Sequence, residues 1–151
     1  PEVLTTIQQV TEKQKGVQQT LADALARDVQ AGLVEGEDID DIARRVQARF
    51  EDMQTWKARQ IAQTSATPGF ERGQQLAYSE AGVEWKGWLS QRDAAVRREH
   101  FEADGQTVRV DEPFLVGGES LQHPGDPAGS ASNVIGCRCS TRPRLDGPDE
   151  T

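Results

Sequence analysis

The feature that most constrains this chain is the spacing of the apolar residues in its first 82 positions. They recur at steps of three, four and seven residues, which places them on one face of each of several helices. Only 35% of the 151 residues are hydrophobic and 28% are charged, so a large independent core is not expected. The first half is therefore predicted to consist of amphipathic helices that bury their apolar faces against partner surfaces.

The first helical stretch covers residues 1 to about 29, with a break or kink near Gly16. The linker after it contains Gly32 and Gly36, which we interpret as stop signals. Asp38 is expected to cap a second helix. The apolar face of this second helix is formed by Ile39, Ile42, Ala43, Val46, Phe50 and Met53. We expect this face to pack against other helices of the chain and against another protein.

A third helical stretch begins near Thr55 and is expected to stop at Gly82. The dipeptide Thr67-Pro68 lies inside it. A proline at this point either begins a new helix at its first position or kinks one longer helix. The sequence leaves both arrangements open.

After the third helical stretch, the helical spacing of apolar residues gives way to strand and turn signals. Trp85 and Trp88 mark a short strand, on whose opposite faces they are expected to lie. Ser90 and Asp93 form a candidate capping pair for a short helix that ends near His100.

Turn and strand signals continue to the end of the chain. Asp104-Gly105 is a strong turn signal, and Val108 and Val110 alternate with polar residues as in a second strand. Residues 117–133 are rich in Gly, Pro and Ser and predict a long loop. The predicted fold is α+β, with an amphipathic helical region at 1–82, a small sheet-containing subdomain at 83–144 and a disordered tail at 145–151.

Charge and hydropathy argue against several classes of protein. The chain carries 25 acidic and 17 basic residues, and its formal charge of -8 opposes non-specific wrapping by nucleic acid. It has no stretch of 18 apolar residues, and its start lacks the basic and then apolar order of a secretory signal. We expect a soluble protein made in the cytoplasm, without membrane contact.

The histidines and cysteines of the chain all lie in its last third, at His100, His123, Cys137 and Cys139. Two sulfur and two nitrogen ligands suit structural zinc, so these four residues are a candidate metal site. The single residue between the cysteines makes chelation by both awkward, and a disulfide between them would close a strained ring. The alternative is packing, in which one thiol is buried beside a strand and His100 hydrogen-bonds a loop. The sequence alone favours packing.

Charged residues near His100 have two interpretations. We expect Asp93, Arg97 and Asp104 to form an internal salt-bridge set that fixes the short helix to the Asp-Gly turn. The rival interpretation pairs Asp104 with His100 as an acid/base couple. That couple would need a pocket and a nucleophile, and the sequence indicates neither.

The second half carries an ordered series of short motifs. In chain order they are Trp88, Asp93 with Arg97, His100, Asp104-Gly105, Phe114, His123-Pro124-Gly125-Asp126-Pro127, Asn133 and Cys137-Arg138-Cys139. Each motif alone is weak, but their order resembles the C-terminal signature of the Mu F-like minor head protein family of tailed bacteriophages. The first half resembles the helical region that usually precedes this signature in the family, so the resemblance covers roughly residues 20 to 143. One departure is Gly136, where the family commonly has an asparagine.

The resemblance implies a non-catalytic role in the virion. It implies a low-copy protein of the capsid interior near the portal vertex, which assists head assembly and DNA packaging or delivery. The implied partners are the portal, other head proteins and further copies of the chain. The same domain occurs fused behind portal proteins, so a chain that begins with Pro1 is expected to be a processed protein or a piece of such a fusion.

Two alternatives belong to other classes of function. The first is a nuclease or toxin-like effector delivered with the genome and built around His100 and Asp104. The second is a zinc-stabilised DNA-binding module, which is suggested by a basic strip of Arg138, Arg142 and Arg144. Such a strip is more often a solvated edge that protects the last strand from mispairing.

Overall fold

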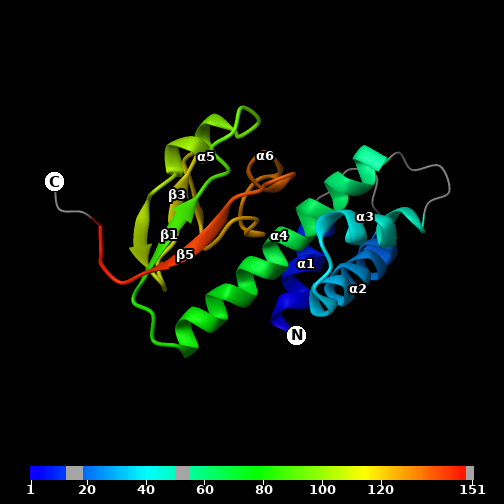
Figure 1. The fold of residues 1–151 in the computed structure, drawn as a ribbon, viewed down its shortest axis with the longest axis horizontal. Coiled ribbons are helices and arrows are strands. Elements are labelled where there is room, and N and C mark those ends of the chain that lie inside the picture. The colour runs from blue at the N-terminus through cyan, green and yellow to red at the C-terminus, as the bar shows by residue number, and fades with distance from the viewer. Residues whose placement is uncertain (13–18, 50–54, 149–151) are drawn as a thin grey trace.

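The computed structural model describes residues 1–12, 19–49 and 55–148 (Figure 1). The helices are α1 (Glu2–Glu12), α2 (Gln19–Glu35), α3 (Ile39–Gln47), α4 (Thr55–Glu80), α5 (Arg98–Ala103) and α6 (Ala131–Val134). The strands are β1 (Trp85–Leu89), β2 (Thr107–Arg109), β3 (Phe114–Val116), β4 (Glu119–Leu121) and β5 (Ser140–Arg144). The predicted α+β class is confirmed, while the subdomain boundary at residue 82 and the disordered tail stay predictions. Within these ranges no helix combines the length and the apolar character needed to cross a membrane.

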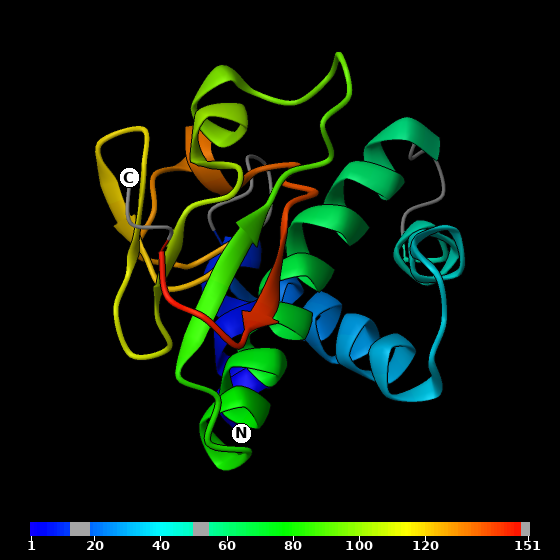
Figure 2. The same cartoon turned by 60° about the vertical axis from the view of Figure 1, so that its left-hand side comes forward.

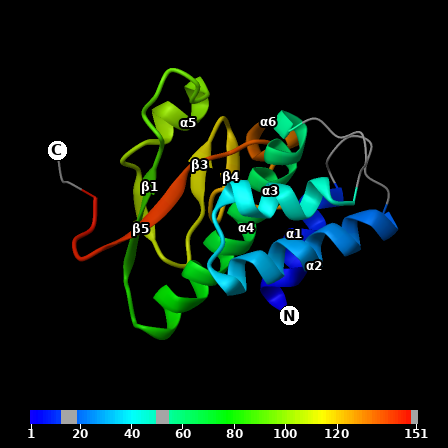
Figure 3. The same cartoon turned by 45° about the vertical axis from the view of Figure 1, so that its right-hand side comes forward.

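Helix α4 lies between α1, α2 and α3 on one side and strand β5 on the other. The helices α1, α2 and α3 pack against it, and β5 contacts it from the sheet (Figures 1 and 2). Figure 3 shows α2 and α3 side by side, on the part of the molecule away from β1 and β5. One long helix thus contributes side chains to both halves of the fold.

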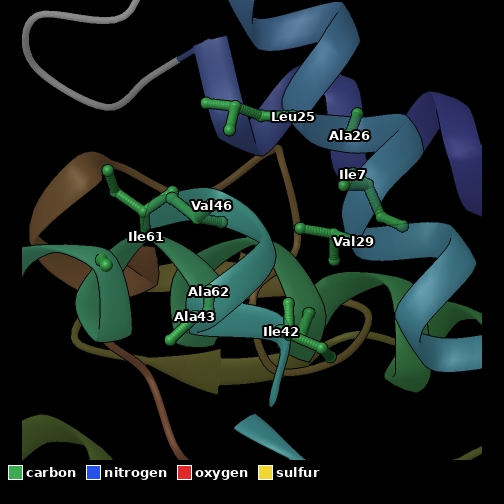
Figure 4. Close-up of a cluster of buried hydrophobic side chains, with 11 residues drawn as sticks. Ile7, Leu25, Ala26, Val29, Ile42, Ala43, Val46, Ile61 and Ala62 are labelled. Atoms are coloured by element: carbon green, nitrogen blue, oxygen red, sulfur yellow. The ribbon is translucent and has the colours of Figure 1, made fainter. Parts of the chain in front are cut away.

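The helical half is held together by small aliphatic side chains (Figure 4). They are Ile7, Leu25, Ala26, Val29, Ile42, Ala43, Val46, Ala58, Ile61, Ala62 and Ala66. Of the apolar face predicted for the second helix, Ile42, Ala43 and Val46 are therefore buried within the chain, while Ile39 is only partly buried. Phe50, Met53 and the break predicted near Gly16 lie outside the described residues.

Gly32 does not end its helix, contrary to the prediction, because α2 continues through it to Glu35. A Cβ atom at Gly32 would lie 2.8 Å from Ile42 Cγ1 and 2.9 Å from Glu37 Oε2. This glycine therefore allows close packing of α2 and α3. The turn after α2 is made at Gly36, whose φ of 74° is the left-handed conformation that glycine adopts without strain.

The other predicted helix ends agree with the structure. Asp38 caps α3, and its Oδ1 accepts the backbone N–H of Asp41 at 2.8 Å. Gly82, with a φ of 71°, lies in the turn that follows α4. Of the two arrangements left open at Pro68, the structure shows one helix with the proline inside it.

Two antiparallel sheets form the second half. One has the strand order β2-β1-β5, and the other is the hairpin β3-β4. Trp88 in the central strand is fully buried and lies edge-on to the Phe114 ring, with 5.3 Å between the ring centroids. Trp85 is only partly buried, as expected for the opposite face of the strand. The remaining members of this core are Ala103, Val116, Leu121, Cys137 and Cys139.

Two local predictions in this half are wrong. Residues 117–133 are not one long loop, because they contain β4 and the first residues of α6. The short helix does not start after Ser90 but at Arg98. The Ser90 N–H donates to Asp104 Oδ1 at 2.9 Å, and Asp93 Oδ1 accepts the Ala95 N–H at 3.1 Å, so both residues are engaged in turns.

Candidate metal centre

The two cysteines lie on an extended segment that leads into β5. Gly136, with a φ of 67°, turns the chain out of α6 just before them. Because side chains alternate along extended backbone, Cys137 and Cys139 point to the same side and Arg138 points away. Both cysteines are free and buried. The single intervening residue, which seemed to hinder joint chelation, therefore brings the two sulfur atoms together.

His100 faces both sulfur atoms from α5. Its Nδ1 lies 3.7 Å from Cys137 Sγ and 3.4 Å from Cys139 Sγ. One donor atom from each residue lies within 4.8 Å of the other two, and all three residues are buried. The Trp88 ring packs edge-on against the imidazole, with 5.9 Å between centroids. Three of the four candidate metal ligands thus converge at one buried site.

The structure does not bring His123 to this cluster, so the expected set of four ligands reduces to three. The Nδ1 of His123 lies 2.9 Å from the carbonyl oxygen of the next residue. Its side chain lines a separate cavity of about 590 Å³, together with Glu2 of α1 and Arg72 of α4. Gly125 turns this loop against α4 at Pro68, which fixes the position of the histidine. Burial lowers the pKa of His123 and favours a neutral ring.

The predicted salt-bridge set of Asp93, Arg97 and Asp104 is not formed. Asp93 pairs with Arg138 through two contacts of 2.8 and 2.9 Å, and this guanidinium holds the pKa of Asp93 below its usual value. Asp104 pairs with Arg92 at 2.8 Å. Arg97 donates to a backbone carbonyl beside the cysteine segment. These motif residues therefore fix the loops around the cluster and do not bind one another.

The rival acid/base couple of His100 and Asp104 is not formed either. Burial raises the pKa of Asp104, but the Ser90 N–H and the Arg92 guanidinium outweigh this effect and hold the pKa below its usual value. Both of its carboxylate oxygens have donors of their own. His100 faces sulfur atoms instead. Asp104 and His100 are thus engaged with other partners.

The loop His123-Pro124-Gly125-Asp126-Pro127 is held in shape by its own aspartate. Asp126 Oδ2 accepts the Gln122 N–H at 2.7 Å, and Oδ1 accepts the Ala128 N–H at 2.9 Å. Pro127 lines the cavity beside His123. This loop contacts α4 at Pro68. The Asp104-Gly105 turn follows α5.

Helix α4 holds the backbone on both sides of Cys137. The Gly136 N–H donates to Thr64 Oγ1 at 2.8 Å, and Thr67 Oγ1 donates to the Cys137 carbonyl at 2.9 Å. These threonines are one helical turn apart, so they face the same side of α4. The position of the first sulfur atom is thus set by a helix that lies about seventy residues earlier in the chain.

This face of α4 was not predicted from the sequence. Five buried side chains with polar groups recur on it at three- and four-residue steps: Thr64, Thr67, Glu71, Gln75 and Tyr78. We call this set the polar stripe. Its spacing was the available signal, because polar residues at helical period predict one face just as apolar residues do.

Glu71, in the polar stripe, joins α4 to β5. Its Oε2 accepts the Thr141 hydroxyl at 2.7 Å and the Thr141 N–H at 3.2 Å. Burial raises the pKa of Glu71 to about 7, and the hydrogen bonds from Thr141 offset only part of this effect. Because the folded-state pKa lies above the unfolded value of 4.5, this group favours folding fully below pH 4.5, and the contribution is lost as pH rises through about 7.

The free energy of unfolding should therefore fall by up to about 3 kcal/mol between about pH 5 and pH 8 because of Glu71. Glu71→Gln should remove most of this slope and stabilise the chain at pH 8 relative to the wild type. Urea unfolding across this pH range measures both effects. Glu80→Gln, at the exposed end of the same helix, is the matched control and should keep the wild-type slope. An unchanged slope in Glu71→Gln would contradict the assignment.

The two thiols interact strongly. The hydrogen bond from the Cys139 thiol holds the pKa of Cys137 well below the usual thiol value, and His100 adds to this effect. Cys137 and burial raise the pKa of Cys139 in turn. In the described part of the chain, Trp88 Nε1 and His100 Nε2 are among the few buried side-chain atoms without a hydrogen-bond partner. The Trp88 N–H nevertheless lies close enough to Cys139 to lower the pKa of that thiol.

A buried lysine was also missed. Lys86 Nζ donates to the Gln122 carbonyl at 2.7 Å and to Gln75 Oε1 at 3.2 Å, and it lies 5.0 Å from the centroid of the Phe114 ring. Burial lowers the pKa of Lys86 to about 8. Lys86 shares a strand face with Trp88, so the alternation of side chains along β1 could have placed it inside.

Comparison with known proteins gives two matches. The family model described as "Phage Mu protein F like protein" matches residues 23–142. A curated relative, the "NAD(+)--arginine ADP-ribosyltransferase EFV" of Enterococcus faecalis (strain ATCC 700802 / V583), is 36% identical over 131 residues. This match covers 84% of the present chain but 26% of the relative, so the chain spans about a quarter of that protein. No solved structure matches.

The family match covers the greater part of both halves of the fold. It begins in α2, includes all of α4 and extends into β5. His100, Cys137 and Cys139 all lie within it. The resemblance that rested on the motifs of the second half is thus confirmed over most of the chain. The chain belongs to the Phage Mu protein F-like family and is a bacteriophage head-related protein that associates with the virion.

Proposed function

We propose that the chain is a minor head protein that lies inside the capsid near the portal and assists head assembly and DNA packaging or delivery. The observation that carries this proposal is the family match over residues 23–142. The net charge of -8 agrees with a protein that binds head proteins in preference to bulk DNA. The role proposed is one of binding and assembly, without catalysis.

The basic strip of Arg138, Arg142 and Arg144 is poorly suited to bind DNA. Arg138 is paired with Asp93. Arg142 and Arg144 lie on β5, an edge strand, and their side chains flank Gly87 of the neighbouring strand. Charged side chains on an edge strand suit protection against mispairing. In a gel shift we expect no salt-dependent binding of DNA by the chain.

The helical half exposes an apolar surface that suits a protein partner. Phe70 of α4 is 53% exposed and lines a groove of about 230 Å³ with Leu33, Ile39 and Ala66. We call this the Phe70 groove. Exposed aromatic side chains are enriched at protein interfaces, where they contribute much of the binding energy. Ile39 is thus the described residue of the predicted second-helix face that stays available for this contact, because Ile42, Ala43 and Val46 are buried.

Size-exclusion chromatography with light scattering tests this role. The full chain is run alone and with the portal protein encoded by the same phage, and we expect the two to elute together. Phe70→Ser should weaken the complex. Phe101→Ser, at a 58% exposed phenylalanine on α5, is the matched control and should leave it intact. A monomer that does not bind the portal would contradict the proposal, and loss of binding only in Phe101→Ser would contradict the contact at the Phe70 groove.

The name of the relative raises a second candidate, which is transfer of ADP-ribose to arginine. The 36% identity over most of this chain favours a shared module, but about three quarters of the relative has no counterpart here. The module shared by the two proteins is, on this proposal, not the catalytic part. Incubation of the chain with NAD+ and an arginine-containing acceptor should give no nicotinamide release. Release that depends on protein concentration would favour the enzyme.

A further inference from the structure

We infer that His100, Cys137 and Cys139 bind one zinc ion. Zinc–sulfur bonds of about 2.3 Å and a zinc–nitrogen bond of about 2.0–2.1 Å at the tetrahedral angle place sulfur and nitrogen about 3.6 Å apart. The two sulfur–nitrogen distances at this site are 3.4 and 3.7 Å. Both sulfur–nitrogen distances thus match those around a single tetrahedral ion, and all three donor atoms lie within 4.8 Å of one another.

Packing alone explains this arrangement less well. A neutral imidazole nitrogen that accepts a hydrogen bond has one lone pair, so Nδ1 of His100 can accept from one thiol at a time. Both sulfur atoms nevertheless lie at similar distances from that nitrogen. An ion placed among the three atoms would satisfy all of them. Coordination would need both sulfurs as thiolates and would release thiol protons to solvent.

The ligands are held in place by residues around them. Thr67 of α4 binds the Cys137 carbonyl, and the ion pair of Arg138 with Asp93 keeps the intervening side chain outside. Among the described residues the buried N–H of Trp88 has no hydrogen-bond partner, and the indole belongs to the same core cluster as Cys139. A metal-bound thiolate accepts such a donor, and outer contacts of this kind orient the ligands of metal sites.

Three protein ligands leave one position of a tetrahedral ion open. A cavity of about 100 Å³ adjoins His100 and Cys139 and is also lined by Arg97 and Gly136. A water molecule takes up about 30 Å³ of liquid, so this cavity has room for one as the fourth ligand. The ion would join α5 to the cysteine segment, and through Thr64 and Thr67 to α4. Metal binding should therefore stabilise the fold.

Metal analysis of the full chain tests this inference. Protein prepared with zinc and then dialysed should retain one equivalent, and His100→Ala, Cys137→Ser and Cys139→Ser should each lose it. His123→Ala changes the other histidine of the chain and should retain the metal. Loss in His123→Ala would overturn the three-residue site, and so would wild-type protein that retains no stoichiometric zinc.

Two measurements on the wild type keep the test independent of whether the variants fold. Replacement of zinc by Co2+ should give thiolate-to-cobalt charge-transfer bands and the intense visible bands of tetrahedral cobalt. A strong chelator should lower the melting temperature. A cobalt spectrum without thiolate bands, or a melting temperature unchanged by the chelator, would overturn the inference. Neither measurement depends on portal binding, so the metal site and the proposed function can fail separately.

Discussion

Replacement of Trp88 by alanine is expected to lower the free energy of unfolding by about 3–5 kcal/mol. The indole is fully buried and packs edge-on against both Phe114 and His100. It belongs to the same core cluster as the two cysteines. Removal would leave a cavity in the centre of the sheet that its rigid neighbours could fill only in part. Urea unfolding followed by circular dichroism measures the loss.

Trp56→Ala is the matched control for this variant. Trp56 lies in the first turn of α4 and is 63% exposed, so its removal should lower the free energy of unfolding by less than about 1 kcal/mol. Equal losses in the two variants would show that the sheet core is not packed around Trp88. A loss of less than about 1 kcal/mol in Trp88→Ala would contradict the described core directly.

Gly125→Ala should cost about 3 kcal/mol, from two separate causes. Gly125 has a φ of 74°, a conformation that costs a residue with a Cβ about 1–2 kcal/mol. The added Cβ would also lie 2.9 Å from Pro68 Cδ and 3.0 Å from Pro68 N. The second of these is a backbone atom of α4, so it cannot move aside as the end of a flexible side chain would. The loop that carries His123 should therefore lose its contact with the helix.

Gly118→Ala separates the two causes. Gly118 has a similar φ of 80°, but an added Cβ there would meet nothing within 4 Å. This variant should therefore show only the backbone cost of about 1–2 kcal/mol. Thermal or urea unfolding of both variants gives the difference, which measures the contact between the loop and Pro68. Equal destabilisation would mean that the loop does not pack on α4 as described.

The helical half was largely predictable because local sequence signals determine where its helices begin and end and which faces they bury. Asp38 and Gly82 act as cap and stop signals, and the buried faces of the helices follow the 3.6-residue period. Gly32 was misread because its role depends on Ile42, a residue of the next helix. A glycine that ends a helix and one that admits a neighbouring helix look alike in sequence. The continuity of α4 through Pro68 likewise depends on packing and not on local preference.

The candidate site was predictable only in part. Cys137, Cys139 and His100 were identified by residue type, but His123 was grouped with them by nearness in sequence alone. Its actual position depends on the contact of Gly125 with Pro68, which no local pattern indicates. The predicted ion pairs failed for the same reason, because the partners of charged residues are set by how loops pack.

Quantitative mass spectrometry of purified, DNA-filled particles of the encoding phage tests the central claim most directly. Intact particles are treated with protease before the capsid is opened, so that exposed proteins are removed. If the chain is an internal minor head protein, its peptides should survive this treatment at a few copies per particle and be digested only after the capsid is opened. Absence of the chain from filled particles, or its digestion while the capsid is intact, would contradict the account.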